Sequence, residues 1–438
     1  MYEKITDDLI RFLKDSPTCY HAVSNIRTAL LESGYTELTE GARWTVSKGG
    51  KYFTVRNESS LIAFRIPQTA VTGFMIGAAH SDSPSFKIKA NPEMSVENAY
   101  IRLNVEKYGG MMCAPWLDRP LSVAGRLIVK NGNRFETKLV KVDRDLVLIP
   151  NLAIHMDREV NDGHKYNPQV DMLPLFGDQN AKGRFREIMA EAAGVSAKDV
   201  IGDDLFLYSR TPAAVWGADG EYFSSGHIDD LQCAYANLRG FLDASDAASG
   251  STPVYALFDN EEVGSGTKQG AASTFLSDVL TRIGECTGLT QETLRMAIAG
   301  SMMVSADNGH AVHPNFPEKT DPVNRPHMNA GILIKHSANQ KYTTDSVSAA
   351  LFRDICARAG VPWQDFTNRS DMAGGSTLGN ISNAQVSLNS VDVGLAQLAM
   401  HSPYETAGTK DTAYLAEAMR TFYSLTLTDE GQGSYTLA

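Results

Sequence analysis

The chain has 438 residues, of which 43% are hydrophobic and 21% are charged, and its formal net charge is −11. This composition is typical of a soluble globular protein and excludes a disordered chain, and the negative charge argues against nucleic acid as a partner. Scattered cysteines without CxxC spacing, the lack of a signal-peptide core and the lack of a long apolar run predict a cytoplasmic protein that does not enter a membrane.

The first 90 residues begin with helices and end with strands. Apolar residues at helical spacing predict two helices within the first 34 residues, separated at Ser16-Pro17. Strands are predicted within 44–67, and the apolar run 71–79 predicts a buried strand that ends at the motif HSDSP, residues 80–84. Polar residues directly after a buried strand are candidates for a functional site.

Residues 93–150 consist of short runs in which apolar and polar residues alternate, which predicts antiparallel strands. Asn131-Gly132 and Asp143-Arg144 are predicted turns between them, and one amphipathic helix is predicted near 183–194. We therefore expect a β-rich domain over 91–223, inserted between the two parts of another domain, 1–90 and 224–438. Its strand edges need covering, which suggests self-association.

From Ser224 onward, predicted helices and strands alternate. Helices are expected at 227–244, 270–282, 345–359 and 412–425, and strands at 253–259, 296–307, 330–337 and 384–394. This alternation predicts an α/β fold with a mixed, largely parallel sheet sandwiched by helices.

Metal-ligating residue types recur where the predicted strands end, and two more lie elsewhere, Asp229 just before a predicted helix and His401 in the loop before the last one. Each one alone is more often a cap or a turn residue. Several at one side of one sheet predict a shared site, because ligands of open α/β sheets bind beyond the carboxyl ends of the strands. The candidates are His80, Asp82, Asp229, Glu261, Glu262, Asp307 and His401.

One predicted strand ends at three acids, Asp259, Glu261 and Glu262, which repel one another unless a cation lies between them. Ligands of the His, Asp and Glu types suit zinc, manganese or cobalt. The candidate ligands are too many for one catalytic ion and suit two ions that share a bridging carboxylate. Neighbouring Glu261 and Glu262 point different ways, so one can bind metal while the other acts as a general base. The spacing of His80 and Asp82 lets the carboxylate orient the imidazole.

Four motifs resemble, in this order, those of the M18 metallopeptidase family: HSDSP (80–84), DNEEVGSG (259–266), SADNGHAVHPN (305–315) and MHSPYE (400–405). The similarity covers nearly the whole chain. It implies a zinc-exopeptidase-like catalytic domain with an inserted β-rich dimerisation domain, and co-catalytic hydrolysis of peptides with free N-termini. It also implies a homo-oligomer in which dimers assemble into a dodecamer, and two divalent metal ions, zinc in the first place, with manganese or cobalt as alternatives.

The resemblance also implies roles for single residues. One ion would be bound by His80, Asp229 and Asp307, and the other by Asp229, Glu262 and His401. Asp229 would bridge the ions, Glu261 would be the general base, and Asp82 would be the partner of His80. The family has Asp-Asn at the bridging position where this chain has Asp229-Asp230.

Two further residues are implied to contact substrate. Lys335 aligns with the family's anchor for an acidic side chain, although on pattern alone a lysine at the end of an apolar strand more often extends to solvent. His155 ends the segment LAIH and is implied to project into the active site of a neighbouring subunit, although the pattern fits a surface histidine equally well.

Candidates for substrate contact also surround Asp307 and a glycine-rich stretch. His310 and His313 lie close to Asp307; one of them can donate a hydrogen bond to an oxyanion or to substrate, and the other can anchor the loop, with no catalytic role expected for His313. Residues 371–380 lack the lysine and serine spacing of a phosphate loop, so contact with a peptide is expected. Tyr342 is a further candidate, although such a tyrosine is more often part of the core.

These patterns predict an aminopeptidase that preferentially releases N-terminal Asp or Glu. A neutral, leucine-type aminopeptidase with the same metal site is the alternative, and related two-metal folds also serve carboxypeptidases and deacetylases. A non-catalytic oligomeric scaffold would be expected to lose the base or a ligand, and this chain keeps them all.

Overall fold

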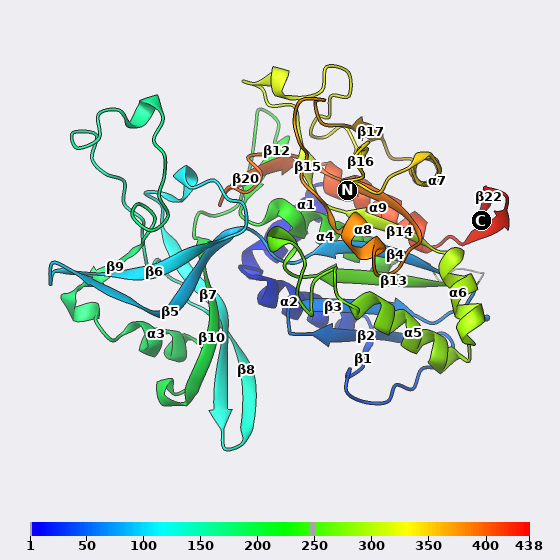
Figure 1. The fold of residues 1–438 in the computed structure, drawn as a ribbon, viewed down its shortest axis with the longest axis horizontal. Coiled ribbons are helices and arrows are strands. Elements are labelled where there is room, and N and C mark those ends of the chain that lie inside the picture. The colour runs from blue at the N-terminus through cyan, green and yellow to red at the C-terminus, as the bar shows by residue number, and fades with distance from the viewer. Residues whose placement is uncertain (1, 246–249) are drawn as a thin grey trace.

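In a computed structural model of the protein, which describes residues 2–245 and 250–438, a nine-stranded mixed sheet forms the centre of the molecule. A second sheet of six strands lies beside it (Figure 1). In spatial order, the strands of the central sheet are β1 (Thr36–Glu37), β2 (Lys51–Arg56), β3 (Ser60–Arg65), β13 (Ser251–Phe258), β4 (Gly73–His80), β14 (Met302–Ala306), β18 (Asn389–Gly394), β16 (Ile332–Lys335) and β17 (Trp363–Phe366).

Parallel strands at the middle of this sheet position the candidate residues. β4 pairs in parallel with β13 and with β14, and β14 pairs in parallel with β18. The carboxyl ends of these strands therefore lie at one edge, where His80 is opposite Phe258. Towards the sides, β3 and β16 run antiparallel to β13 and β18. The sheet is thus mixed and parallel at its centre, as predicted.

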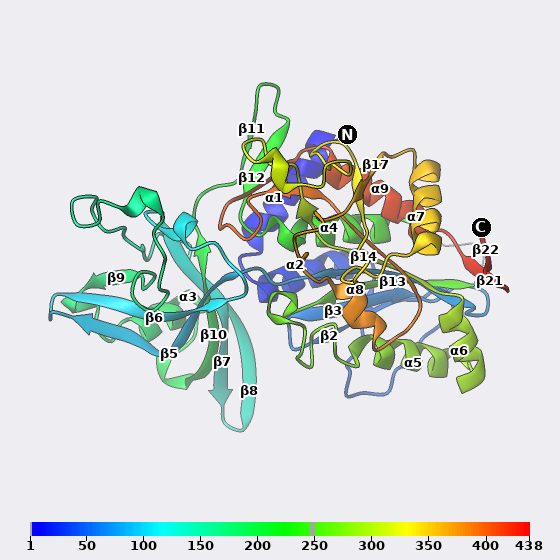
Figure 2. The ribbon, with the colours of Figure 1, turned by 45° about the horizontal axis from the view of Figure 1, so that its top comes forward.

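Helices cover both faces of the central sheet because alternate side chains of each strand point to opposite sides. Met75 and Ala79 of β4 pack with α2, α4, α7 and α9, whereas Phe74, Ile76 and Ala78 pack on the side of α5, α6 and α8. Figure 2 shows α4, α7 and α9 on one side of the sheet and α5 and α6 on the other. The helices are α1 (Tyr2–Asp15), α2 (Cys19–Glu32), α3 (Phe185–Ala192), α4 (Ile228–Asp243), α5 (Phe275–Thr287), α6 (Gln291–Ala299), α7 (Ser346–Ala359), α8 (Leu378–Asn383) and α9 (Asp411–Tyr423).

The fold class is therefore the predicted one, an α/β sheet sandwiched by helices. Among the described residues, no helix has the length and apolar character that crossing a membrane requires.

One predicted strand is partly wrong. The sequence predicts a strand over 296–307, but Met296 to Ala299 form the end of α6, and β14 begins only at Met302. A capping box starts this helix, in which Thr290 Oγ1 accepts a hydrogen bond from the backbone N–H of Thr293 at 3.1 Å. A short apolar run fits a buried helix and a buried strand equally well, so the cap decides the outcome.

The six-stranded sheet is formed by residues between Ser85 and Ser209. Its strands are, in spatial order, β8 (Arg134–Lys141), β7 (Leu121–Asn131), β10 (Val200–Ser209), β5 (Ser85–Val96), β6 (Tyr100–Tyr108) and β9 (Leu175–Asp178). The predicted turn at Asn131-Gly132 joins β7 and β8, whereas Asp143-Arg144 leads only to isolated bridges at 147–149. The sheet has a hydrophobic core of its own, which includes Phe86 and Trp116. The boundaries at 91 and 223 and the dimerisation role stay predictions.

A third, small sheet crosses the carboxyl edge of the central sheet. It places the loop 399–404, which carries His401, beside the residues that follow β14. Its strands are β11 (Ala214–Trp216), β12 (Tyr222–Ser225), β20 (Glu405–Gly408), β19 (Ala396–Leu398) and β15 (Gly309–His310), and β21 (Leu427–Gly431) and β22 (Ser434–Leu437) form a separate hairpin.

Candidate active site

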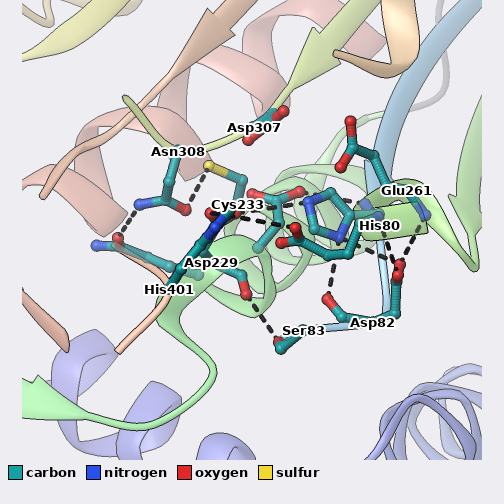
Figure 3. Close-up of polar contacts among 12 residues, drawn as sticks. His80, Asp82, Ser83, Asp229, Cys233, Glu261, Asp307, Asn308 and His401 are labelled. Atoms are coloured by element: carbon teal, nitrogen blue, oxygen red, sulfur yellow. Dashed lines mark hydrogen bonds and ion pairs between the residues drawn. The ribbon is translucent and has the colours of Figure 1, made fainter. Parts of the chain in front are cut away.

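Most of the predicted site residues line one cavity of about 320 Å³ at the edge where β4, β13 and β14 end. Asp82 does not line this cavity but contacts the ring of His80 (Figure 3). His155 is exposed in the segment between η1 (Ala114–Trp116) and β9 and does not line this cavity. The predicted residues that line it are His80, Asp229, Glu261, Glu262, Asp307, His310, Lys335, Tyr342 and His401.

Local backbone structure brings the cavity residues to the sheet edge. His80 is the last residue of β4 and is 1% exposed. Asp229 lies in the first turn of α4, where its φ of −82° and ψ of 109° depart from helical values. Glu261 and Glu262 begin the short helix η5 (Glu261–Val263) directly after β13. His401 lies in the loop between β19 and β20.

Asp229 lies at the centre of the potential metal ligands. Its Oδ1 is 3.5 Å from His80 Nε2, and its Oδ2 is 3.4 Å from His401 Nε2. Glu262 Oε2 is 3.3 Å from the same His401 nitrogen. Although Asp229 Oδ1 is buried, it accepts no hydrogen bond from any residue that the structure describes. A buried carboxylate oxygen without a hydrogen-bond donor suits a metal ligand.

Two compact groups of donor atoms share Asp229. Ligand atoms of His80, Asp229 and Glu262 lie within 4.8 Å of one another, and so do those of Asp229, Asp230 and Asp307. His/Asp/Glu donors without cysteine suit zinc, and also manganese and cobalt. The donor set therefore fits divalent cations.

The pKa values of the site show that it favours positive charge. Burial raises the pKa of Glu261 to about 8 and the pKa of Glu262 to about 7. Burial opposes protonation of the His401 imidazole, but the Asp229 and Glu262 carboxylates raise its pKa to about 11. Because Glu261, Glu262 and His401 hold their protons more tightly than usual, a divalent cation would stabilise this part of the site.

Asp82 connects His80 with the glutamate pair (Figure 3). His80 Nδ1 is 3.0 Å from the carbonyl oxygen of Asp82 and 3.4 Å from its Oδ1. The backbone N–H groups of Glu261 and Glu262 donate to Oδ1 and Oδ2 of Asp82, each at 3.1 Å. Asp82 thus holds the imidazole through its carbonyl oxygen, with its carboxylate close by, and holds the turn that carries the glutamates through its carboxylate.

Lys335 lies inside the cavity and not in solvent, where pattern alone would place it. Its Nζ donates to the carbonyl oxygen of Asn308 at 2.8 Å and lies 3.8 Å from Asp307 Oδ1. Burial disfavours the ammonium, but nearby carboxylates, Asp307 first, raise the pKa of Lys335 above its usual value. A Cβ at Gly394 would lie 3.1 Å from Cε of Lys335 and 1.8 Å from the carbonyl oxygen of Asp307, so glycine leaves room for the side chain.

Glu405 is a site residue that the sequence pattern does not single out. Its Oε2 accepts a hydrogen bond from the backbone N–H of Asp229 at 3.1 Å, and its Oε1 accepts one from that of His401 at 2.8 Å. It is 2% exposed. Glu405 therefore fixes the backbone of two potential ligands. Glu405 is the last residue of the motif MHSPYE, so the motif could have pointed to it. A glutamate that begins a strand, however, does not by itself indicate a role in a site.

Buried histidines and carboxylates around a cavity at the carboxyl edge of an α/β sheet define a site of the metallohydrolase class. The match to a family of known proteins is more specific, because the model of the aminopeptidase I zinc metalloprotease family (M18) covers residues 12–423. The chain belongs to this family of zinc aminopeptidases, and the predicted family is confirmed.

Individual relatives agree with this assignment. A probable M18 family aminopeptidase 2 of Clostridium acetobutylicum is 47% identical over 425 residues, which cover 95% of this chain and 98% of the relative. A cryo-EM structure of the Ape4 and Nbr1 complex matches with a TM-score of 0.93 and 33% identity, covering 97% of this chain and 86% of that chain. A structure of the S. cerevisiae mApe1 dodecamer matches with a TM-score of 0.85 and 28% identity, covering 96% and 97%.

Removal of divalent cations with EDTA is expected to abolish peptidase activity and to lower Tm. The buried carboxylates would lose the charge that balances them, and zinc at a thousand times its Kd contributes about 4 kcal/mol to the stability of the folded state. Thermal unfolding and peptide hydrolysis are measured before and after chelation. Zinc should restore both quantities, whereas magnesium, which prefers all-oxygen ligands, should not. Full activity of metal-free protein would contradict the metal site.

Proposed function

We propose that the protein is a two-metal aminopeptidase that releases N-terminal residues, preferentially Asp or Glu, from peptides. The observation that carries this proposal is Asp229, whose two carboxylate oxygens face His80 and His401 in a cavity that also contains Glu261. The ions are proposed to be zinc, with manganese or cobalt as alternatives. The proposed ligands are His80, Asp229 and Asp307 for one ion and Asp229, Glu262 and His401 for the other.

The residues of the cavity are proposed to have different roles in hydrolysis. When bound, the divalent ions supply Lewis acidity, which activates water and polarises the peptide carbonyl. Glu261 takes a proton from the attacking water and returns it to the nitrogen of the leaving amine. His310 lines the same cavity and can donate an N–H to the developing oxyanion. Asp82 holds the backbone of Glu261 and the ring of His80 in place.

The size of the cavity supports removal of a single residue. Its volume of about 320 Å³ is at the small end of the roughly 300–1,000 Å³ that ligand pockets span. The free α-amine of the substrate would pair with the acids of the site. We therefore expect peptides with acetylated N-termini to be poor substrates, which separates an aminopeptidase from a carboxypeptidase or a deacetylase.

Lys335 supports the preference for acidic residues. Among the described residues that line the cavity, it is the one Lys or Arg side chain. One of its three N–H groups bonds to Asn308, which leaves two for a substrate carboxylate. A local cation is needed because the net charge of −11 repels an acidic substrate.

Hydrolysis of matched Asp-, Glu- and Leu-p-nitroanilides by the zinc-loaded protein tests the proposal, with N-acetyl-Asp-p-nitroanilide as the blocked control. Release after Asp or Glu, and none from the blocked substrate, is the expected result. Faster hydrolysis of the Leu substrate than of the Asp and Glu substrates would be compatible with the metal mechanism. It would replace the proposed preference for acidic residues by a preference for neutral residues. No turnover of any free-amine substrate would contradict the proposed function and favour a scaffold.

Lys335→Met is expected to lower the ratio of kcat/KM for the Asp substrate to that for the Leu substrate by about 10- to 100-fold, since a hydrogen bond to a charged group contributes about 1.5–3 kcal/mol. The ratio separates lost selectivity from general damage, because Lys335 also neighbours Asp307. Lys319, which lines a neighbouring cavity, is the matched control, and Lys319→Met should keep the ratio. An unchanged ratio in Lys335→Met would remove Lys335 from substrate selection.

The proposal includes a homo-oligomer in which His155 enters the active site of a neighbouring subunit. Similarity to the mApe1 dodecamer supports such an assembly. Side chains around His155 are apolar and exposed, with Leu152 at 56% and Met156 at 74%, which suits a surface that another subunit covers. A cytoplasmic location stays part of the proposal, and the free cysteines of the described chain support it.

A further inference from the structure

The last residue of strand β6 and the residues that follow it lead from the six-stranded sheet to the active site. We call residues 108–112 the strap. Tyr108 Oη donates to Asp82 Oδ2 at 2.7 Å. Further along, the carbonyl oxygen of Gly110 is hydrogen-bonded to Nδ1 of His401, and the backbone N–H of Met112 donates to the carbonyl oxygen of His401 at 3.2 Å. The strap therefore touches the surroundings of both proposed metal positions.

Gly109 shows how closely the strap passes the glutamate turn. Its φ is +78°, and a Cβ at this position would lie 3.1 Å from Cβ and 3.2 Å from the carbonyl oxygen of Glu262. Such a close approach with a positive φ favours glycine. The strap is thus packed against the turn and is not a loose connection.

Hydrogen-bond donors around Tyr108 fix the direction in which its proton points. Asn260 Oδ1 accepts from Thr267 Oγ1 and from Gln269 Nε2, each at 2.8 Å, so the amide nitrogen of Asn260 faces Tyr108. This nitrogen donates to Tyr108 Oη at 2.8 Å. Because the phenol accepts from Asn260, its own proton is directed to Asp82. The chain of donors therefore ends on the Asp82 carboxylate.

We propose that Tyr108 is a positioning residue of the active site, which acts through Asp82 on His80 and on the turn that carries Glu261 and Glu262. The inference rests on the proposed function of these residues. A hydrogen bond from a phenol to a carboxylate is short and charge-assisted, and it would restrict rotation of Asp82. Rotation of the Asp82 carboxylate would remove its Oδ1 from the 3.4 Å contact with His80 Nδ1 and would displace the two backbone N–H groups bonded to it. The orientation of the six-stranded sheet thereby contributes to the geometry of the metal site.

Tyr108→Phe is the first test. It is expected to lower kcat by about 10- to 100-fold and zinc affinity by about 10-fold, the range for partners that orient metal ligands. KM should stay within about twofold, because Tyr108 does not line the cavity. Zinc affinity is measured by competition with a chromogenic chelator, so this result does not depend on turnover.

Tyr208→Phe is the matched control. Tyr208 belongs to β10 of the same sheet, is 6% exposed, and donates to the carbonyl oxygen of Val142 at 2.8 Å. This variant also loses one buried phenol hydrogen bond, but kcat and zinc affinity should not change. Equal losses in both variants would mean that Tyr108 only supports the sheet, and unchanged kcat and zinc affinity in Tyr108→Phe would also overturn the proposal.

A double-mutant cycle tests the route through Asp82. In an Asp82→Asn background, Tyr108→Phe is expected to cause no further loss of zinc affinity, whereas equal fold losses in both backgrounds would overturn the proposed route. Should Tyr108→Phe fail to fold, Asn260→Asp is the second variant, because it places an acceptor opposite the phenol. It should weaken zinc binding as Tyr108→Phe does. An unchanged zinc affinity of Asn260→Asp would contradict the inference. If the wild-type protein binds zinc but hydrolyses no peptide, the proposed function fails while the zinc measurements still decide the role of Tyr108.

Discussion

Glu261→Gln is expected to lower kcat by about 10²- to 10⁴-fold, the usual contribution of a general base. The amide has nearly the shape of the carboxyl group but cannot take a proton from water. The backbone N–H of residue 261 would still donate to Asp82. We therefore expect KM and zinc content to stay close to those of the wild-type protein. Steady-state kinetics with Asp-p-nitroanilide and metal analysis of the same sample measure both quantities.

Glu285→Gln is the control for this substitution, because Glu285 is an exposed glutamate on α5. It should change neither kcat nor zinc content. Full activity of Glu261→Gln would exclude Glu261 as the base and leave the neighbouring Glu262 as the candidate. Loss of zinc together with activity would make Glu261 a ligand instead.

Asp229→Asn is expected to have the second large effect, with a loss of zinc from both groups of ligands and a fall in kcat on the order of 10³-fold or more. Asp229 is buried and lies between the His80 and His401 imidazoles. Burial alone would raise the pKa of Asp229, but the imidazoles of His401 and His80 lower it, so the carboxyl stays charged. Asn at this position would remove the negative charge from the residue that both proposed sets of metal ligands share. Zinc stoichiometry by metal analysis and kcat are the measurements.

Asp230→Asn provides a closely matched control. Asp230 is the next residue, and its Oδ2 accepts a hydrogen bond from the backbone N–H of His80 at 3.1 Å. Burial raises the pKa of Asp230 well above its usual range, so an amide is a closer match to this carboxyl than to an ordinary aspartate. We expect kcat to stay within a few-fold of wild type. Loss of zinc in Asp230→Asn but not in Asp229→Asn would transfer the bridging role to Asp230.

The sequence could predict the part of the site that follows from parallel strands. His80 ends a buried strand, the acids after β13 and Asp307 follow buried strands, and parallel neighbours bring such ends to one edge. Their order in the motifs also placed the chain in its family. These signals are local, so each could be found without knowledge of the rest of the fold.

Residues that reach the site from other elements left no such signal. Tyr108 ends a strand of a different sheet, and its role depends on how the two sheets meet. The resemblance to the family implied Lys335, but the pattern alone predicted solvent, because its direction depends on β16 running antiparallel to β18 and on the room that Gly394 leaves for the side chain. Glu405 acts on the backbone of two distant segments. Contacts of this kind arise from tertiary packing, which periodicity and motif spacing do not contain.

Asp229 and His401 meet across the small sheet, although α4 and the loop after β19 are far apart in the chain. During synthesis, most of the protein is therefore made before His401, the last proposed ligand. The donor atoms come together only when the sheets have folded. Nascent or truncated chains that lack His401 would have no complete site. We expect them to leave surrounding polypeptides intact, so that synthesis of this peptidase does not expose the cell to an enzyme that is active before it has folded.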